Sequence, residues 1–217
     1  SGEIYEILPL SNGIVFSYCK EYVDEGVMVS YKMVSFETGR FTDITKNVYL
    51  LSKFGNNYKA VVKNCENYIT VKSIILPTGK TFLVEPDGRA MLLDNDATNI
   101  WNGSLIYRGE APSDIVLYDN SLWASYSECN ALVRYNLSTM REELRIGGNK
   151  SPFKAPKDLF VDGSFVYVSN KDSKELLKVD LNSYTISSEQ TFKEEIYQYV
   201  KVLNRGFVLL KSGLYVL

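Results

Sequence analysis

Hydrophobic and polar residues alternate in short segments along the whole chain, and this pattern predicts β-strands. Turn-forming residues interrupt the segments about every 8 to 12 residues. The clearest group predicts strands at 158–162, 165–170, 175–181 and 185–192. The preceding group predicts strands at 114–118, 122–126, 131–137 and 141–146. Each group is therefore expected to form one antiparallel sheet of four short strands.

These two groups are copies of one pattern. Residues 111–137 and 155–181 align without a gap, 44 positions apart. The identical pairs are Ala111/Ala155, Pro112/Pro156, Asp114/Asp158, Ser125/Ser169, Leu132/Leu176 and Leu137/Leu181. A period of this length, made of short strands and turns, is typical of β-propeller blades. The sequence therefore predicts an all-β fold, a propeller of antiparallel blades with three to four strands each.

The rest of the chain predicts further blades with looser spacing. The predicted strands are 4–8, 14–21, 27–36 and 40–45 for a first blade, 48–53, 58–64 and 68–76 for a second, and 80–85, 89–93, 98–101 and 104–107 for a third. A partial unit at 199–203, 207–210 and 214–217 is expected to close the ring, because joining the first and last blades leaves no open sheet edge. We predict one propeller domain over residues 1–217, with six blades, or five as the alternative.

The second copy carries a family resemblance. Its segment Tyr167-Val168-Ser169-Asn170, followed by Leu177-Lys178-Val179-Asp180-Leu181, resembles a blade of the YVTN-type propeller repeats. In the first copy, Trp123-Ala124-Ser125-Tyr126 replaces that motif, and the resemblance covers about two-fifths of the chain. The wider superfamily also contains NHL repeats and gluconolactonase-like propellers. Its members range from surface and scaffold proteins to lactonases and lyases, so the resemblance implies a fold and leaves the activity open.

Composition narrows the classes of partner. The chain is 45% hydrophobic and 23% charged, which is ordinary for a soluble globular protein. Its formal net charge is −2, and its Lys and Arg residues are scattered, so nucleic-acid binding is not expected. No stretch approaches the roughly 18 apolar residues of a membrane span, so membrane insertion is not expected.

Cysteine usage and the first residues bear on the compartment. Cys19, Cys65 and Cys129 show no C-x-x-C spacing, so free, half-buried thiols are expected instead of a metal or redox cluster. A disulfide within one pair stays open as an alternative if the protein is secreted. The chain starts Ser1-Gly2, which looks like a cleavage scar. An extracellular or cell-surface location is therefore favoured over a cytoplasmic one.

The absence of histidine limits the chemistry. Without an imidazole, the chain lacks Ser-His-Asp and Cys-His catalysis and every His-ligated metal site. Streptogramin-lyase-like activity, which relies on histidine, is disfavoured. Carboxylate, tyrosine or lysine acid–base chemistry and oxygen-ligated calcium remain available.

Two aspartates are the candidates for a metal site. Asp114 and Asp158 start the predicted innermost strands of adjacent blades, where their side chains could converge on a cation at the mouth of the central channel. Each could instead accept hydrogen bonds from backbone N–H groups at a turn, and we prefer this structural role. The alternative function is therefore a gluconolactonase-like, carboxylate-based hydrolase that depends on Ca²⁺.

Two loops resemble ligand-binding motifs only in part. Residues 94–99 begin like a calcium loop but lack the Gly at position six and the Glu at position twelve. Residues 147–151 lack the first Gly of a phosphate loop, and Pro152 interrupts any following helix. We expect a solvated turn in the first case and a connection between blades in the second.

The leading interpretation is a recognition scaffold without a catalytic site and without a cofactor. A ring of loops would present a rigid surface to a protein or glycan partner. We expect the contacts on the rim that carries the 126–130 and 170–174 loops, because these loops join the second and third strands of the best-defined blades. The candidate partner-binding residues are Tyr126, Glu128, Asn170, Asp172 and Trp101.

Overall fold

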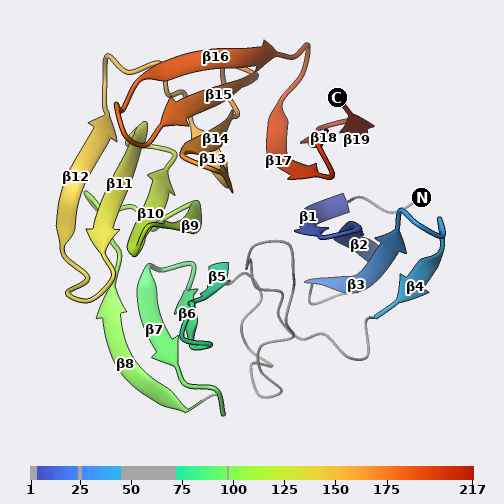
Figure 1. Ribbon diagram of the computed structural model, residues 1–217, viewed down its shortest axis with the longest axis horizontal. Helices are drawn as coiled ribbons and strands as arrows, with labels where there is room; N and C mark the ends of the chain where they lie inside the picture. The colour runs from blue at the N-terminus through green and yellow to red at the C-terminus, as the bar shows by residue number, and fades with distance from the viewer. Residues whose placement is uncertain (1–3, 24–25, 45–71, 97) are drawn as a thin grey trace.

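A computed structural model describes residues 4–23, 26–44, 72–96 and 98–217. Within these ranges the chain forms 19 strands and no helix, so it contains no helix long and apolar enough to cross a membrane. The strands form five antiparallel sheets arranged in a ring (Figure 1). The described part of the chain is thus a β-propeller with five blades, the number given above as the alternative to six.

Each blade is a meander of strands that follow one another in sequence. The strands of the blades, from the innermost outward, are β1 (Ile4–Leu10), β2 (Gly13–Val23), β3 (Gly26–Ser35) and β4 (Phe41–Asp43); β5 (Lys72–Ile75), β6 (Thr81–Val84), β7 (Arg89–Leu93) and β8 (Asn99–Ser104); β9 (Asp114–Tyr118), β10 (Ser121–Tyr126), β11 (Ala131–Asn136) and β12 (Glu142–Gly147); β13 (Pro156–Asp162), β14 (Phe165–Asn170), β15 (Glu175–Asp180) and β16 (Ile186–Thr191); and β17 (Ile196–Val202), β18 (Arg205–Leu210) and β19 (Gly213–Val216).

The two repeated blades follow the predicted plan, and the structure corrects the prediction elsewhere. The sequence predicted 68–76 as the last strand of the second blade, but the end of this segment is β5, the innermost strand of the next blade. Ile74 of β5 packs against Phe82 of β6 in that blade. The predicted strands 98–101 and 104–107 are replaced by the single strand β8, which pairs along β7 through Gly103. Most of the predicted second blade, residues 48–71, lies outside the described residues.

The core lies between neighbouring blades. Val116 and Trp123 pack against Leu159 of the next blade, whereas Ile115, the neighbour of Val116 along β9, packs with Ile74 of the preceding blade. Both faces of an inner strand are therefore covered, and β10 and β14 are buried at five consecutive positions. The outer strands β12 and β16 are mostly exposed. Burial on both faces explains why the inner strands read as continuous apolar runs.

The first and last blades meet and close the ring, as predicted. In Figure 1, β17 lies beside β1, and Val200 and Phe207 pack against Ile7 in one hydrophobic cluster. The buried Gln198 side chain stabilises this contact with two hydrogen bonds. Its Oε1 accepts a hydrogen bond from the Ile7 N–H at 2.7 Å, and its Nε2 donates to the Ile7 carbonyl at 2.8 Å. Because β1 is an edge strand of its sheet, this amide supplies partners that no neighbouring strand provides.

Candidate binding site at the channel mouth

β-Bulges shape the ends of the innermost strands at one face of the ring. The pairing of β13 with β14 shifts between Pro156 and Asp158, and the pairing of β17 with β18 shifts between Ile196 and Gln198. Strand β1 has the same shift two residues after its start. A bulge bends the strand and changes where its extra residue points. The side chains of Lys157 and Tyr197, which lie within the bulges, both line a pocket at the mouth of the channel.

The two candidate metal ligands are engaged in hydrogen bonds between blades. Asp114 Oδ2 accepts a hydrogen bond from the Leu159 N–H at 2.9 Å, and Asp158 Oδ2 accepts one from the Tyr199 N–H at 3.4 Å. Each aspartate therefore satisfies an edge N–H of the next innermost strand, as the closing glutamine does for β1. Among the described residues, no group of three or more His, Cys, Asp or Glu side chains is placed to hold a metal ion. Calcium binding stays a prediction from the sequence.

The pocket at the channel mouth has a volume of about 270 Å³ and is lined by residues from four blades, three of which contribute charged side chains. The described residues that line it are Ile4, Glu6, Lys72, Lys157, Asp158, Lys171, Tyr197 and Gln198. Three lysines face two carboxylates, and one of these carboxylates, Asp158, already accepts a backbone N–H. The balance of charge in the pocket is therefore positive.

Lys157 interacts with both of the other lysines of the pocket. Partial desolvation, together with the charges of Lys171 and Lys72, lowers the pKa of its ammonium group. Its Nζ lies 5.1 Å from the centroid of the Tyr197 ring, which is a cation–π contact. The Tyr197 hydroxyl donates to Glu195 Oε2 at 2.9 Å, and this bond lowers the pKa of the Glu195 carboxyl. The arrangement can bind an anion, which would relieve the repulsion between the ammonium groups.

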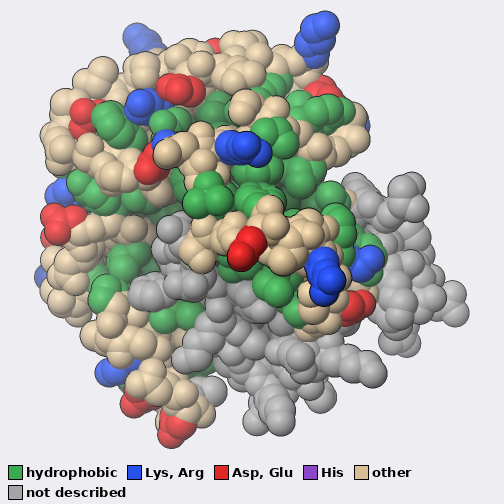
Figure 2. All heavy atoms as spheres, turned by 45° about the vertical axis from the view of Figure 1, so that its right-hand side comes forward, with side chains coloured by type: hydrophobic (Ala, Val, Ile, Leu, Met, Phe, Trp, Pro, Cys, Tyr) green, Lys and Arg blue, Asp and Glu red, His purple; other side chains and the backbone are tan. Residues whose placement is uncertain are grey.

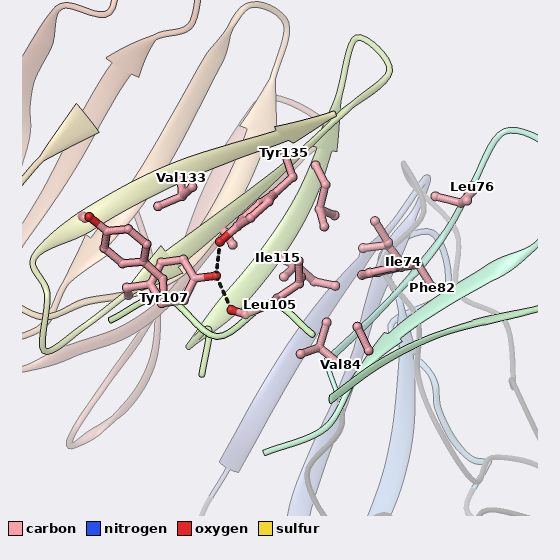
Figure 3. Packing of buried hydrophobic residues seen from close by; sticks show 14 residues of the cluster. Ile74, Leu76, Phe82, Val84, Leu105, Tyr107, Ile115, Val133 and Tyr135 are labelled. Carbon is pink, nitrogen blue, oxygen red and sulfur yellow. Dashed lines mark hydrogen bonds between the residues drawn. The ribbon is translucent and has the colours of Figure 1, made fainter. Parts of the chain in front are cut away.

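Tyr126 and Asn170 do not reach the surface where we expected them. In Figure 3, dashed lines mark the hydrogen bonds that link the labelled Leu105 and Tyr135 through Tyr126, which is drawn without a label. Tyr126 is fully buried, and its hydroxyl donates to the Leu105 carbonyl at 2.6 Å. Its oxygen lies 2.7 Å from the Tyr135 hydroxyl, which acts as the donor because the single Tyr126 proton is already used. Asn170 is also fully buried, and its Oδ1 accepts from the Lys154 N–H at 2.6 Å. Both side chains hold loops in place beneath the rim.

The other three predicted residues lie on two different faces. Glu128 and Asp172 are exposed on the β10–β11 and β14–β15 turns, at the same face as the channel mouth. Trp101 is half-buried and stacks on Phe82, with 6.1 Å between ring centroids. Trp101 lines an apolar pocket of about 120 Å³ with Met140, which follows the β11–β12 turn at the opposite ends of the strands. The structure therefore does not bring Trp101 together with the two acidic residues.

Our sequence reasoning missed the lysines, although the repeat contained a signal for two of them. Lys157 and Lys171 occupy the positions of Ser113 and Ser127 in the preceding blade. Those two serines touch, with 2.6 Å between their hydroxyl oxygens, so the two positions are neighbours in space. A pair of lysines at neighbouring positions of one copy was visible in the sequence. The third lysine, Lys72, comes from another blade and had no such signal.

Comparison with known proteins supports the fold. No family model matches the chain, and no curated protein matches it. A streptogramin B lyase structure is similar over 98% of this chain and 82% of its own, with a TM-score of 0.67 and 12% identity. The chain is a β-propeller. A structure of the nidogen/laminin complex covers 88% of this propeller and 80% of its own chain, with a TM-score of 0.61 and 12% identity. Virginiamycin B lyase from Staphylococcus aureus is similar over 99% of this chain and 88% of its own chain, with a TM-score of 0.57 and 14% identity. At these identities the likeness shows the fold alone.

Proposed function

We propose that this propeller is a recognition module that binds an acidic segment of a partner protein at the channel mouth, without catalysing a reaction. The observation that carries the proposal is the convergence of Lys72, Lys157 and Lys171 in one open pocket of about 270 Å³. A carboxylate that entered this pocket would favour the charged form of each lysine. The exposed turns around the pocket would supply further contacts to the same partner.

The distribution of charge favours a protein over a glycan. An acidic glycan chain carries many charges along its length and is matched by an extended basic surface. In Figure 2, acidic and basic side chains are scattered over the visible face and do not form one basic stripe. A compact cluster of three lysines suits one or two carboxylate side chains of a peptide segment. The rim also presents acidic residues, Glu128 and Asp172, which would repel a uniformly anionic chain.

The fold and the composition are consistent with binding. One of the similar structures is the nidogen/laminin complex, which supports the use of such a propeller in contact with another protein. The lyases among the similar structures share the fold at 12% and 14% identity, and the 217 residues of this chain contain no histidine for imidazole chemistry. We also assign the Tyr167–Asn170 blade to the YVTN type, on the resemblance of its residues.

Binding to model acidic partners tests the proposal, with variants taken from the protein itself. Lys157→Ser combined with Lys171→Ser copies the serines of the preceding blade, so the fold should tolerate it. The matched control is Lys80→Ser in the β5–β6 turn, at the opposite end of its blade. We expect the wild type to bind an immobilised polyglutamate peptide in biolayer interferometry, more weakly as salt is raised. The double variant should lose about fivefold or more in affinity, since a solvent-accessible ion pair contributes up to about 1 kcal/mol.

Two results would contradict the proposal. Equal binding by the wild type and the double variant would remove the lysines from the site. Binding to heparin in preference to polyglutamate would identify an acidic glycan as the ligand in place of a protein. The Lys80→Ser control should leave the affinity unchanged, so a general loss of positive charge can be separated from a loss at the channel mouth.

A further inference from the structure

A second pocket lies on the rim of the β9–β12 blade, beside the connection from β8 to β9. It has a volume of about 290 Å³, is open to solvent, and is lined in part by Arg108, Arg145 and Lys150. Cys129 forms part of its wall, and burial together with the nearby Glu110 raises the pKa of that thiol. The thiol therefore stays neutral at physiological pH, and the charge of the pocket comes from its basic residues.

Tyr107 holds the two arginines in position. Its ring centroid lies 5.6 Å from the guanidinium carbon of Arg108 and 5.8 Å from that of Arg145. The Tyr107 hydroxyl also accepts a hydrogen bond from Arg145 Nη1. The ring itself is buried against Tyr126, with 5.2 Å between centroids, and so rests on the core of the blade. Two like charges are thus placed around one fixed ring.

The connection between β8 and β9 contains a hydrogen-bonded turn that holds the backbone of Arg108 in place. Tyr107 and Glu110 pair through two backbone hydrogen bonds of 2.9 and 3.0 Å and close a tight turn. Arg108 and Gly109 inside the turn have φ values of +52° and +89°, which is the pattern of a type I′ turn. The hydrogen-bonded turn therefore fixes the backbone from which the Arg108 side chain extends over the Tyr107 ring.

The carboxylate of Glu110, which ends the same turn, accepts hydrogen bonds from the backbone of a neighbouring loop. Glu110 Oε1 accepts the Glu128 N–H at 2.9 Å, and Glu110 Oε2 accepts the Cys129 N–H at 3.0 Å. Within the described part of the chain, Arg108, Arg145 and Lys150 form no ion pair. Glu142 interacts with Arg145 electrostatically, without direct contact. The pocket therefore gathers three positive charges that no carboxylate of the described residues contacts directly.

The repeat shows that the propeller does not need a charge at the position of Arg145. Arg145 pairs with Val133, and Leu177, which lies 44 positions after Val133, pairs with Ser188 in the next blade. The β13–β16 blade therefore forms the same four-stranded sheet with an uncharged residue at this position. The basic pocket is thus a property of one blade, which indicates a role in binding.

We propose that this pocket binds a phosphate or sulfate monoester. Guanidinium groups present paired N–H donors that match the oxygens of such groups, and two guanidiniums with one ammonium can contact several oxygens of a tetrahedral anion. The pocket is larger than one such anion needs, which leaves room for the group that carries it. This site is separate from the channel mouth, and its occupation does not depend on the function proposed above.

Titration with inorganic phosphate and inorganic sulfate, at constant ionic strength set by NaCl, tests the proposal. The readouts are the NMR signals of the arginine side-chain Nε–H groups and the heat measured by calorimetry. We expect saturable shifts of the Arg108 and Arg145 signals with one or both anions below about 20 mM. The stronger of the two anions identifies the ester type. Sodium acetate serves as the carboxylate comparison and should bind at least about fivefold more weakly.

The variants change exposed residues of the pocket. Arg145→Glu combined with Lys150→Glu reverses two of its three positive charges at exposed positions, so it should fold with an unchanged circular dichroism spectrum and lose binding at least tenfold. Arg108→Gln provides a second, milder test. Arg141→Gln, in the β11–β12 turn at the other end of the blade, is the matched control and should bind like the wild type. Lys157→Ser at the channel mouth should also leave this binding unchanged.

Three outcomes would overturn the proposal. One is the absence of saturable shifts with both anions in the wild type. The second is equal binding by the wild type and the double glutamate variant. The third is acetate binding as strong as phosphate and sulfate binding, which would identify a carboxylate site. None of these outcomes bears on the polyglutamate experiment at the channel mouth, so the two proposals fail independently.

Discussion

The hydrogen bonds between Gln198 and Ile7 allow a direct test of how the ring is closed. Gln198→Leu keeps the approximate size of the side chain and removes both hydrogen bonds to the Ile7 backbone. Ile7 is fully buried and Gln198 is 4% exposed, so water does not readily replace the lost partners. Each buried polar group left without a partner costs about 1–3 kcal/mol, and two such groups give a loss of about 2–6 kcal/mol in the free energy of unfolding.

Urea unfolding followed by circular dichroism would measure this loss. Gln190→Leu, at an exposed position on β16, is the matched control and should change stability by less than about 0.5 kcal/mol. Thermal unfolding should fall by about 2–4 °C for each kcal/mol in a protein of this size. If Gln198→Leu unfolds within about 0.5 kcal/mol of the wild type, the reasoning is refuted and apolar packing alone closes the ring.

Gln198→Glu adds a test of the hydrogen-bond pattern itself. The introduced carboxyl can accept from the Ile7 N–H, but it can donate to the Ile7 carbonyl only when it is protonated. The folded state therefore raises the pKa of this carboxyl above its unfolded value of about 4.3. Its stabilising effect is present below that pH and is lost as the pH rises through the raised pKa. The variant should approach wild-type stability at about pH 4, and a constant deficit between pH 4 and 7 would count against the assigned geometry.

Four further outcomes are expected. Ser169→Ala should leave the free energy of unfolding unchanged or raise it by up to about 1 kcal/mol in urea titrations, because the buried hydroxyl has no hydrogen-bond partner among the described residues. Tyr126→Phe should lower it by about 1–3 kcal/mol, since the bonds to the Leu105 carbonyl and the Tyr135 hydroxyl are lost. Burial raises the pKa of Tyr199 to about 12. Stability should therefore decline as the pH rises above about 10, where the tyrosine ionises in the unfolded chain before it ionises in the folded one. Tyrosine absorbance, followed together with circular dichroism, would show this decline. A recognition module of the proposed kind should show equal melting temperatures in Ca²⁺ and in EDTA, and a clear rise with Ca²⁺ would favour the hydrolase alternative.

Local patterns were enough to predict most of the strands and the type of fold. Each strand is read from alternation within a few residues, and each turn from residues such as Asp162-Gly163. The 44-residue repeat then gives the blade, because a single sheet of this size cannot bury both of its faces without neighbours. The prediction was least accurate at β5 and β8, where pairing partners, and not the local sequence, decide which strand belongs to which sheet.

The candidate sites depended on contacts that local patterns do not contain. Asp114 and Asp158 occupy the same position in the two copies of the repeat, which marked them as candidates, but only the structure shows that each accepts a hydrogen bond from an N–H of the next blade. Tyr126 and Asn170 belong to turn-flanking segments that the sequence places near a rim, yet burial between blades removes their side chains from it.

The sequence by itself determined the strands, the repeat and the absence of imidazole chemistry, since these properties depend on residue types and their spacing. The tertiary structure decided which charges meet. Lys72 and Lys157 line the same pocket only because the innermost strands of different blades surround one channel. The bulge in β13 also directs Lys157 towards this channel. The electrostatic interaction of such groups depends on their separation in space and on the surrounding solvent, neither of which is fixed by separation along the chain.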